Sequence, residues 1–444
     1  MKMEIMSFIG IILGLLVFIA MCFKRYNMLL TAVTSASIMI IFFAPPVEVF
    51  TTGLYIEKLT GTYMGGVAGF LKGYLILFAL SALYGKVMED SGAVRRIALS
   101  LAEATEKSHN NQKFLTVCIL PLFYVILGYC GISGFVVVFT VVALGRELFE
   151  ECNIPWKYYC YGSAGNLTNG VLAGNLQAQN IQAAQIFGVS ISAAPLLSIV
   201  FCTVQLAALF AMIYMDIRKS ERKSEGFLPS GAEIKKLQLA APRPAESCPS
   251  LLISILPLVV TVGCIAAAGL NVLLTLALSI LVSFVLFRGK LADAKDTLGK
   301  GITAAVGPVI SVAAAAGLAS VIAGAPGFKI ISDGLGSLPD LYAGMGLIMT
   351  VTLFTANPVP VFTAFGDRIV SSFTAAGLSP EVGARFALCS EITPCPPWNA
   401  GVVNAVALTK IDFKVAAWYY FKSSFFSGAA GLVAVLILLG CGVF

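Results

Sequence analysis

The chain has 444 residues, of which 58% are hydrophobic and only 12% are charged, and its mean hydropathy is +0.90. A soluble domain of this size carries far more charge, so the composition excludes a soluble protein and predicts several spans in a lipid bilayer. The formal net charge is +6. The basic residues are scattered singly among the predicted loops, as expected for cytoplasmic loops of a membrane protein, and this excludes a nucleic-acid partner.

Cysteine and histidine usage argues against a metal site or a disulfide framework. The eleven cysteines fall mostly inside apolar segments, and none are spaced as a CxxC pair. The single histidine, His109, lies in a polar stretch. We therefore predict that the chain binds no metal and no cofactor.

The first half of the chain begins with long apolar runs that predict spans at 5–23, 28–44 and 68–84. The stretch 45–66 between the second and third runs carries charges and is too interrupted to span, so we expect an arm or an interfacial helix there.

Two irregular membrane segments and one span complete the first half. The apolar run 114–144 is interrupted by Gly and Ser around Ser133 and has charged residues at both ends, which predicts a re-entrant helical hairpin. The segment 155–187 contains the polar stretch Gly165-Asn-Leu-Thr-Asn-Gly170 and predicts a helix broken at that stretch. A further span is predicted at 190–217.

A polar, charged linker at 218–249 separates this half from a second half with the same plan. The second half has predicted spans at 251–270, 271–287, 302–323 and 415–441. It also has a hairpin at 341–373 with Asn357 at its tip, and a broken helix at 380–409 that is interrupted by hydroxyls, a carboxylate and prolines.

The irregular segments of the two halves match at a constant spacing. Asn166-Leu-Thr168 aligns with Glu391-Ile-Thr393, and 391 − 166 = 225, which is also the spacing of Pro155 and Pro380. We predict an all-α polytopic membrane protein built from two inverted repeats of five spans, 1–217 and 250–444. The distribution of Lys and Arg predicts that both termini are extracytoplasmic.

Glu391 is the acidic residue that the sequence places deep in a membrane segment. A buried carboxylate costs several kcal/mol unless it is protonated, paired or bound to a cation, so we expect it to take up a proton near neutral pH or to bind a cation. The alternative is a structural carboxylate that caps the second half-helix.

The tips and breaks supply further polar groups that could bind a substrate. Their hydroxyls and amides can bond a polyhydroxy acid, and the half-helix N-termini offer free N–H groups to a carboxylate. These groups could equally pack between helices. No Arg or Lys is expected in the core to neutralise an anion. The candidates beside Glu391 are Ser133, Asn166, Thr168, Asn169, Asn357, Thr393 and Asn399.

The stretch Gly85-Lys-Val-Met-Glu-Asp-Ser-Gly-Ala-Val-Arg-Arg-Ile-Ala98 resembles a motif of the gluconate:proton symporter family. The plan of two inverted halves is similar to the ion transporter superfamily that includes citrate and dicarboxylate carriers. The resemblance implies a symporter that imports a small organic anion, such as a sugar acid or hydroxycarboxylate, with H⁺ or Na⁺ by alternating access. It also implies a homodimer in a bacterial cytoplasmic membrane.

Two other functions remain open. A cation/proton antiporter could use the same scaffold without an organic substrate. Gly131-Ile-Ser133-Gly134 also matches the Gly-x-Ser-Gly of rhomboid-type intramembrane proteases, but that chemistry needs a histidine base within the membrane, and His109 belongs to a charged stretch. We therefore expect a transporter and not an enzyme.

Overall fold

The computed structural model describes residues 2–24, 26–106, 111–129, 142, 145–146, 148–236, 247–266, 270–291, 293–355, 359–392 and 399–442. Over these residues every regular element is a helix, and six helices are long and apolar enough to cross a membrane. The six are Lys2–Phe23, Leu54–Asp90, Gln112–Tyr129, Pro195–Arg222, Ala294–Gly324 and Phe413–Gly440. The prediction of an all-α polytopic membrane protein is confirmed.

The chain forms two compact units that each combine segments from both halves of the sequence. Unit 1 consists of Met1–Leu75, Ile181–Ala194 and Gly307–Val403, and unit 2 consists of Ile76–Asn180, Pro195–Val306 and Asn404–Phe444. The inverted relation of the halves 1–217 and 250–444 stays a prediction.

Unit 1 contains the N-terminal helices and the hairpin of the second half. Its helices are α1 (Lys2–Phe23), α2 (Met28–Ile41), α3 (Pro46–Thr51), α4 (Leu54–Glu57), η1 (Lys58–Tyr63), the start of α5 (Met64–Asp90), most of α10 (Ala178–Phe187), the end of α15 (Ala294–Gly324), α16 (Phe328–Gly336), α17 (Asp340–Thr355), α18 (Val359–Ala375), α19 (Pro380–Cys389) and the start of α20 (Ala400–Thr409). Helices α17 and α18 pack against each other within the stretch 341–373, which the sequence predicts as a hairpin, and its tip at 356–358 lies outside the described residues. The re-entrant course of this hairpin stays a prediction.

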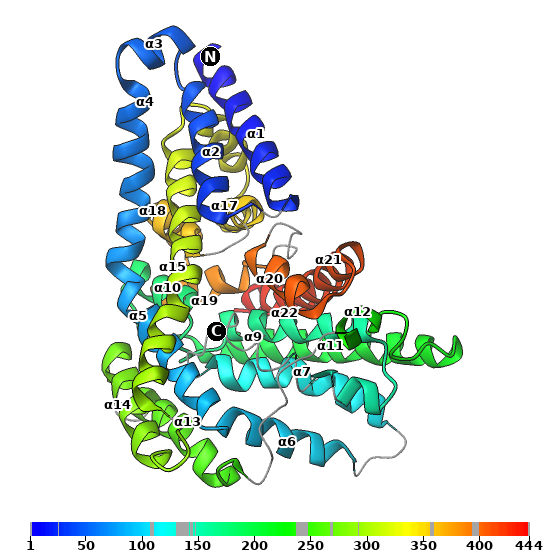
Figure 1. Ribbon diagram of the computed structural model, residues 1–444. Helices are drawn as coiled ribbons and strands as arrows, with labels where there is room; N and C mark the ends of the chain where they lie inside the picture. The colour runs from blue at the N-terminus through cyan, green and yellow to red at the C-terminus, as the bar shows by residue number, and fades with distance from the viewer. Residues whose placement is uncertain are drawn as a thin grey trace. The chain divides into compact units, whose positions relative to one another are not determined.

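Helices α1 and α2 form an antiparallel pair because their contact face is lined by small residues (Figure 1). A Cβ on Gly10 would lie 2.3 Å from the Cβ of Phe42, and a Cβ on Gly14 would lie 2.5 Å from Met39. Asn27 begins α2 by accepting a hydrogen bond of 2.9 Å from the backbone N–H of Leu29. The missing side chains of the two glycines therefore permit the close approach that membrane helices use for association.

The stretch 45–66, expected as an arm or an interfacial helix, is helical over most of its length and continues into the next predicted span, and its place relative to the bilayer stays a prediction. Helices α4, η1 and α5 are continuous over Leu54–Asp90, 37 residues in all. Gly53 adopts φ +74, which ends the preceding turn and starts the long helix. Glu57 and Lys58 do not interrupt it, because their side chains pair with each other at 3.1 Å on the surface.

Unit 2 contains the break of the first broken helix and the final span. Its helices are the end of α5, α6 (Ala93–Glu106), α7 (Gln112–Tyr129), η2 (Trp156–Ser163), α9 (Ala164–Val171), the start of α10, α11 (Pro195–Arg222), α12 (Ala232–Lys236), α13 (Leu251–Ala266), α14 (Val272–Leu286), the start of α15, the end of α20, α21 (Phe413–Phe421), η4 (Lys422–Phe426) and α22 (Ser427–Gly440). The predicted hairpin 114–144 is represented by α7, and most of the rest of it lies outside the described residues.

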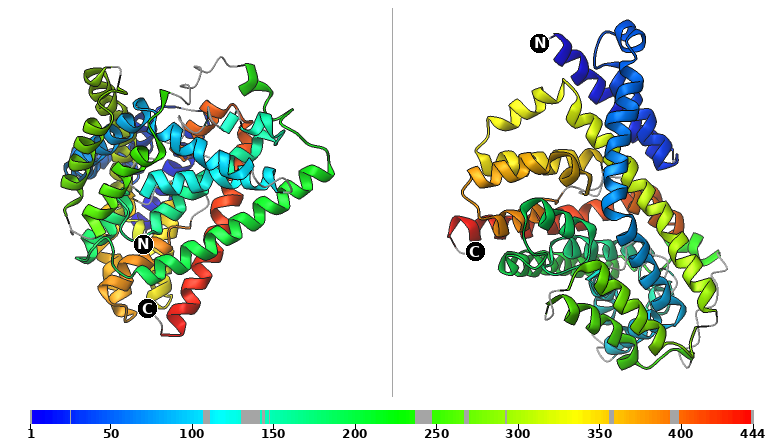
Figure 2. Two further views of the ribbon diagram at one scale, coloured as in Figure 1. Left: turned by 90° about the horizontal axis from the view of Figure 1, so that it is seen from below. Right: turned by 90° about the vertical axis from the view of Figure 1, so that its left-hand side faces the viewer.

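Helix α11 packs along α22, and this contact ties the last spans of the two sequence halves together (Figure 2). A Cβ on Gly431 would lie 2.9 Å from the carbonyl oxygen of Phe201, so the glycine permits the contact. Gln205 donates a hydrogen bond of 3.2 Å to the hydroxyl of Ser427 across the same interface. The final pair of spans is thus held by close packing and by a buried polar contact.

Candidate functional site

The break of the first broken helix lies in unit 2 and is later in the chain than the sequence indicated. Helix α9 continues through Asn166, Thr168 and Asn169, so the expected break at 165–170 is wrong. The backbone leaves the helix at Leu172, and Gly174 follows at φ +79. Gly174 accommodates the left-handed conformation at no steric cost, whereas the polar residues before it are compatible with a helix.

Side chains from the break attach it to the C-terminal end of α7. Gln177 donates a hydrogen bond of 2.7 Å to the carbonyl oxygen of Gly128, and Tyr129 donates one of 3.0 Å from its hydroxyl to the carbonyl oxygen of Ala173. Asn175 accepts a bond of 2.8 Å from the backbone N–H of Gln177. These contacts satisfy backbone groups that a break would otherwise leave unpaired in an apolar environment.

Asn169 is the predicted site residue of this unit with an available buried oxygen. It is 1% exposed, and its amide nitrogen donates a hydrogen bond of 2.7 Å to the carbonyl oxygen of Tyr124. That bond fixes the amide orientation, because a carbonyl oxygen needs a donor. The Oδ1 atom of Asn169 is buried and has no hydrogen-bond partner among the described residues. It can therefore accept a bond from a ligand or coordinate a cation.

The other two predicted residues of α9 do not share this property. Thr168 donates a bond of 2.6 Å to Oε1 of Gln205, which in turn bonds Ser427, so its hydroxyl is part of the packing between helices. Asn166 is exposed. Neither side chain therefore has a buried oxygen that lacks a hydrogen-bond partner among the described residues, as Asn169 does.

The first part of the second broken helix lies in unit 1 and places Glu391 just beyond the end of α19. Ser379 begins α19 by accepting a bond of 3.4 Å from the backbone N–H of Val382, and the helix ends at Cys389. Glu391 is 7% exposed, and its Oε1 atom has no hydrogen-bond partner among the described residues. Asn399 accepts a bond of 3.3 Å from the N–H of Val402 and so caps α20.

Arg385 is buried on α19, which contradicts the expectation that no Arg or Lys lies in the core. It is 2% exposed, and its guanidinium donates bonds of 2.8 Å and 3.2 Å to the carbonyl oxygens of Ile191 and Ala193. The side chain is buried because it satisfies the backbone of a segment nearly two hundred residues earlier.

The remaining predicted residues, Ser133, Asn357 and Thr393, lie outside the described residues. Asn166, Thr168 and Asn169 belong to unit 2, and Glu391 and Asn399 belong to unit 1. Within these units the structure distinguishes Asn169 and Glu391 from the other predicted residues, because each has a buried oxygen that accepts no hydrogen bond from the residues that the structure describes.

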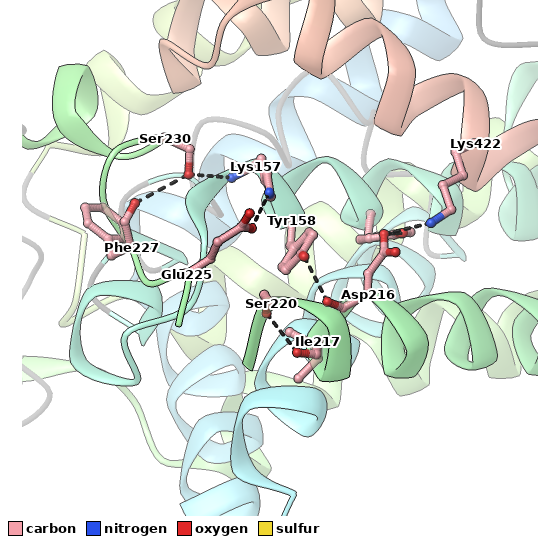
Figure 3. A network of polar contacts seen from close by, with 10 residues as sticks. Lys157, Tyr158, Asp216, Ile217, Ser220, Glu225, Phe227, Ser230 and Lys422 are labelled. Atoms are coloured by element: carbon pink, nitrogen blue, oxygen red, sulfur yellow. Dashed lines mark hydrogen bonds and ion pairs between the residues drawn. The ribbon is translucent and has the colours of Figure 1, made fainter. Parts of the chain in front are cut away.

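Sequence reasoning missed an ion pair between two predicted spans of unit 2. Lys422, at the start of the π-helix η4, lies 2.7 Å from Oδ2 of Asp216 on α11 (Figure 3). Tyr161 also donates a bond of 2.5 Å to Oδ2, and Tyr158 donates one of 2.9 Å to the backbone carbonyl of Asp216. Asp216 and Lys422 are charges of opposite sign inside predicted spans, and this signal could have revealed the pair.

The start of the predicted linker 218–249 is folded against the entrance of the broken helix. Lys157 on η2 pairs with Glu225 at 2.6 Å and donates its backbone N–H to Ser230 at 3.3 Å (Figure 3). Asn153 accepts a bond of 2.9 Å from the N–H of Phe227. The hydrogen bond from the Lys157 ammonium holds the pKa of Glu225 below its usual value of 4.5.

Comparison with known proteins identifies transporters. No family model matches the chain. The chain is 25% identical to the "Uncharacterized transporter YxjC" of Bacillus subtilis (strain 168), and the alignment covers 96% of this chain and 98% of the relative. Among solved structures it is similar to the YdaH transporter of Alcanivorax borkumensis, described as having an unusual topology, with a TM-score of 0.50 and 13% identity over 98% of this chain and 99% of the other.

These likenesses and the membrane-length helices support a multi-pass membrane protein with a transport role. The solved structure supports the fold, and the curated relative extends the likeness to a named transporter over nearly its full length. Both comparisons find transporters, which agrees with the expectation that the chain is not an enzyme. They do not single out the gluconate permease family.

Proposed function

We propose that the protein is a secondary active transporter that imports a small organic anion together with H⁺ or Na⁺ by alternating access. The substrate class is a sugar acid such as gluconate, or a hydroxycarboxylate. This proposal also includes a homodimer, a bacterial cytoplasmic membrane and extracytoplasmic termini. The transport role rests on the comparisons, and the coupling mechanism rests on the residues described above.

The observation that carries the coupling proposal is the buried carboxylate of Glu391. A charged carboxylate in an apolar interior is unfavourable unless it is protonated or has a cation beside it. Oε1 has no hydrogen-bond partner among the described residues, and the residue follows the end of a half-helix. In our proposal Glu391 binds the coupling ion, either as a proton on its carboxyl group or as Na⁺ held by the carboxylate.

Helix α9, which directly precedes the break of the first half, supplies a second polar group for this mechanism. Asn169 presents a buried carbonyl oxygen, which suits a hydroxyl donor of a polyhydroxy acid or a hard cation. The hydrogen bonds between the break and α7 give the break a defined conformation. A ligand that replaced these bonds in one state of the transport cycle would change the equilibrium between states.

The test is transport by purified protein in liposomes with Glu391→Gln as the variant. The amide keeps the shape of the side chain but carries no ionisable proton and no charge. Labelled gluconate is supplied with an inward proton gradient or an inward sodium gradient, and unlabelled citrate, hydroxybutyrate and sugar acids serve as competitors. We expect the wild type to accumulate gluconate under one gradient and the variant to lose accumulation.

Glu381→Gln is the matched control, because Glu381 lies in the first turn of the same helix and is exposed. It is expected to transport as the wild type does. Uphill accumulation by Glu391→Gln would contradict the role of Glu391 in coupling. Absence of uptake by the wild type under every gradient, together with no inhibition by any competitor, would contradict the organic-anion proposal.

A cation/proton antiporter is the second candidate, and a specific observation favours it. Arg385 and Lys422 are both engaged by protein groups, the former by two backbone carbonyls and the latter by a carboxylate. Neither cation is therefore presented to an organic anion. An imposed sodium gradient that changed the internal pH of liposomes without any organic anion would support the antiporter.

A further inference from the structure

A basic surface hollow lies at the C-terminal end of α11 in unit 2. It has a volume of about 590 Å³, and four of its six lining side chains are cationic. The lining residues are Tyr214, Met215, Arg218, Lys219, Arg222 and Lys223. They recur at intervals of four, so they share one side of the helix. Asp216, Ile217 and Ser220 lie on the other side, where Ile217 and Ser220 are buried.

Most of the positive charge in this hollow is not paired with a carboxylate of the residues that the structure describes. Arg218 pairs with Glu221 at 3.2 Å. Lys219, Arg222 and Lys223 are exposed and form no ion pair with any residue that the structure describes. The nearby carboxylate of Glu225 is committed to Lys157 at 2.6 Å. The hollow thus combines three cations that have no ion-pair partner in the described part of the chain with a fourth that is partly compensated. Lys219 and Lys223 interact with the carboxylate of Glu225 only at longer range.

The end of the hollow nearer the N-terminus of α11 is lined by the apolar side chains of Tyr214 and Met215. Tyr214 is 43% exposed and Met215 is 59% exposed. The guanidinium of Arg218 lies 5.1 Å from the ring centroid of Tyr214 and connects the apolar end to the basic end. An occupant that suits both ends has an anionic group next to a hydrocarbon chain.

The length of α11 places this transition at the level of the lipid headgroups. The helix has 28 residues, about 42 Å at 1.5 Å per residue, whereas the hydrocarbon core of a bilayer is about 30 Å thick. The first 20 residues or so, which end near Tyr214, therefore fill the hydrocarbon region. The four cations come shortly after Tyr214 in the sequence, at the level of the membrane–water interface, where Tyr and basic residues are common.

A second surface hollow of unit 2 is of similar size but does not have an excess of positive charge. It lies at the start of α15, has a volume of about 690 Å³ and contains Lys295 and Lys300 together with Asp293 and Asp296. Lys300 pairs with Asp296 at 2.7 Å. Because its carboxylates balance its ammonium groups, this hollow offers no net charge to an anion.

We propose that the basic hollow of α11 binds the phosphate headgroup of an anionic glycerophospholipid. Lys219, Arg222 and Lys223 contact the phosphate, and the acyl chains lie along Tyr214 and Met215. The site is separate from Glu391 and Asn169 and does not rest on the proposed transport function. Each cation near an anionic lipid surface strengthens binding several-fold, so three of them confer a clear preference over a zwitterionic lipid.

The test is lipid binding to the full-length protein in detergent, measured by native mass spectrometry. Phosphatidylglycerol, phosphatidylcholine and inorganic phosphate are the three probes. The variant replaces three cations of the hollow by glutamine, in Lys219→Gln/Arg222→Gln/Lys223→Gln. The control is Lys295→Gln/Lys300→Gln, which changes two lysines of the mixed hollow. All substituted side chains are exposed or border a surface hollow, so the fold is expected to persist.

We expect the wild type and the control to bind phosphatidylglycerol in preference to phosphatidylcholine. The affinity of the triple variant for phosphatidylglycerol should be lower by a factor of about ten or more. For the wild type, added salt should weaken this binding, a measurement that needs no variant. Equal binding of the two lipids, or unchanged binding by the triple variant, would overturn the proposal. Displacement of the lipid by millimolar inorganic phosphate would show a site for the free anion and would overturn it as well.

Discussion

Replacing Asp216 by alanine is expected to destabilise unit 2 by about 2–4 kcal/mol. Removing one partner of a buried ion pair costs about 3–5 kcal/mol, because the other charge is left without compensation. The side chains of Asp216 and Lys422 are 13% and 20% exposed, so water can reach them in part and we lower the estimate. The substitution also removes the acceptor of the Tyr161 hydroxyl, which lies 2.5 Å from Oδ2.

A double-mutant cycle isolates the contribution of the pair. The free energy of unfolding is measured for the wild type, Asp216→Ala, Lys422→Ala and the double variant in mixed micelles with increasing sodium dodecyl sulfate. The double variant removes both charges and leaves neither one uncompensated. Its loss of stability should therefore be smaller than the sum of the single losses by about 1–3 kcal/mol.

The control is an exposed ion pair in the same unit. Lys236 and Glu233 on α12 lie 2.6 Å apart, with side chains 71% and 64% exposed. Lys236→Ala should change the free energy of unfolding by less than about 1 kcal/mol. Single losses at Asp216 and Lys422 that add to the double loss within about 0.5 kcal/mol would refute the reasoning, because independent sites behave in that way.

Three further predictions concern the first broken helix, the linker and α19. Gly128→Ala should lower the free energy of unfolding by about 1–3 kcal/mol in the same micelle titration, because its Cβ would lie 2.1 Å from Nδ2 of Asn169; unchanged stability would contradict that contact. Lys157→Met should destabilise the protein at pH 7, and the deficit relative to the wild type should shrink as the pH falls below 4.5 and protonates Glu225, whose folded-state pKa is depressed; a deficit independent of pH would contradict the pair. Arg385→Met should increase proteolysis at 188–194, because two backbone carbonyls there lose their donors; an unchanged cleavage pattern would contradict this anchoring role.

Local composition predicted the membrane-length helices well. The apolar runs at 5–23, 190–217 and 415–441 correspond to α1, α11 and the final span Phe413–Gly440. The bilayer fixes the required length, and every backbone group in it must be paired within the helix, so hydropathy alone locates such elements. Two helices also lie within the stretch predicted as the second hairpin, where α17 ends at Thr355 and α18 begins at Val359.

The errors arose where distant parts of the chain decide the outcome. Gly165 and Asn169 resemble helix-breaking residues, but the contacts of α9 with α7 and α11 keep them helical, and the break occurs at Gly174. Arg385 is buried because it bonds a segment 192 to 194 residues earlier. Asp216 and Lys422 lie 206 residues apart in the chain. No local pattern encodes such partners, although opposite charges in predicted spans signal that a partner is needed.

The chemistry of the buried groups determines which transport experiment is the most informative. The buried Arg385 and the partly exposed Lys422 are bonded to protein oxygens, whereas Glu391 and Asn169 each have a buried oxygen without a partner among the described residues. Oxygen atoms in that state bind protons, hydroxyl donors or hard cations, and they repel a carboxylate. The dependence on the coupling cation should therefore be the first property that Glu391→Gln changes. If the variant lost only its selectivity among organic anions and kept its cation dependence, Glu391 would belong to the substrate site and the coupling ion would bind elsewhere.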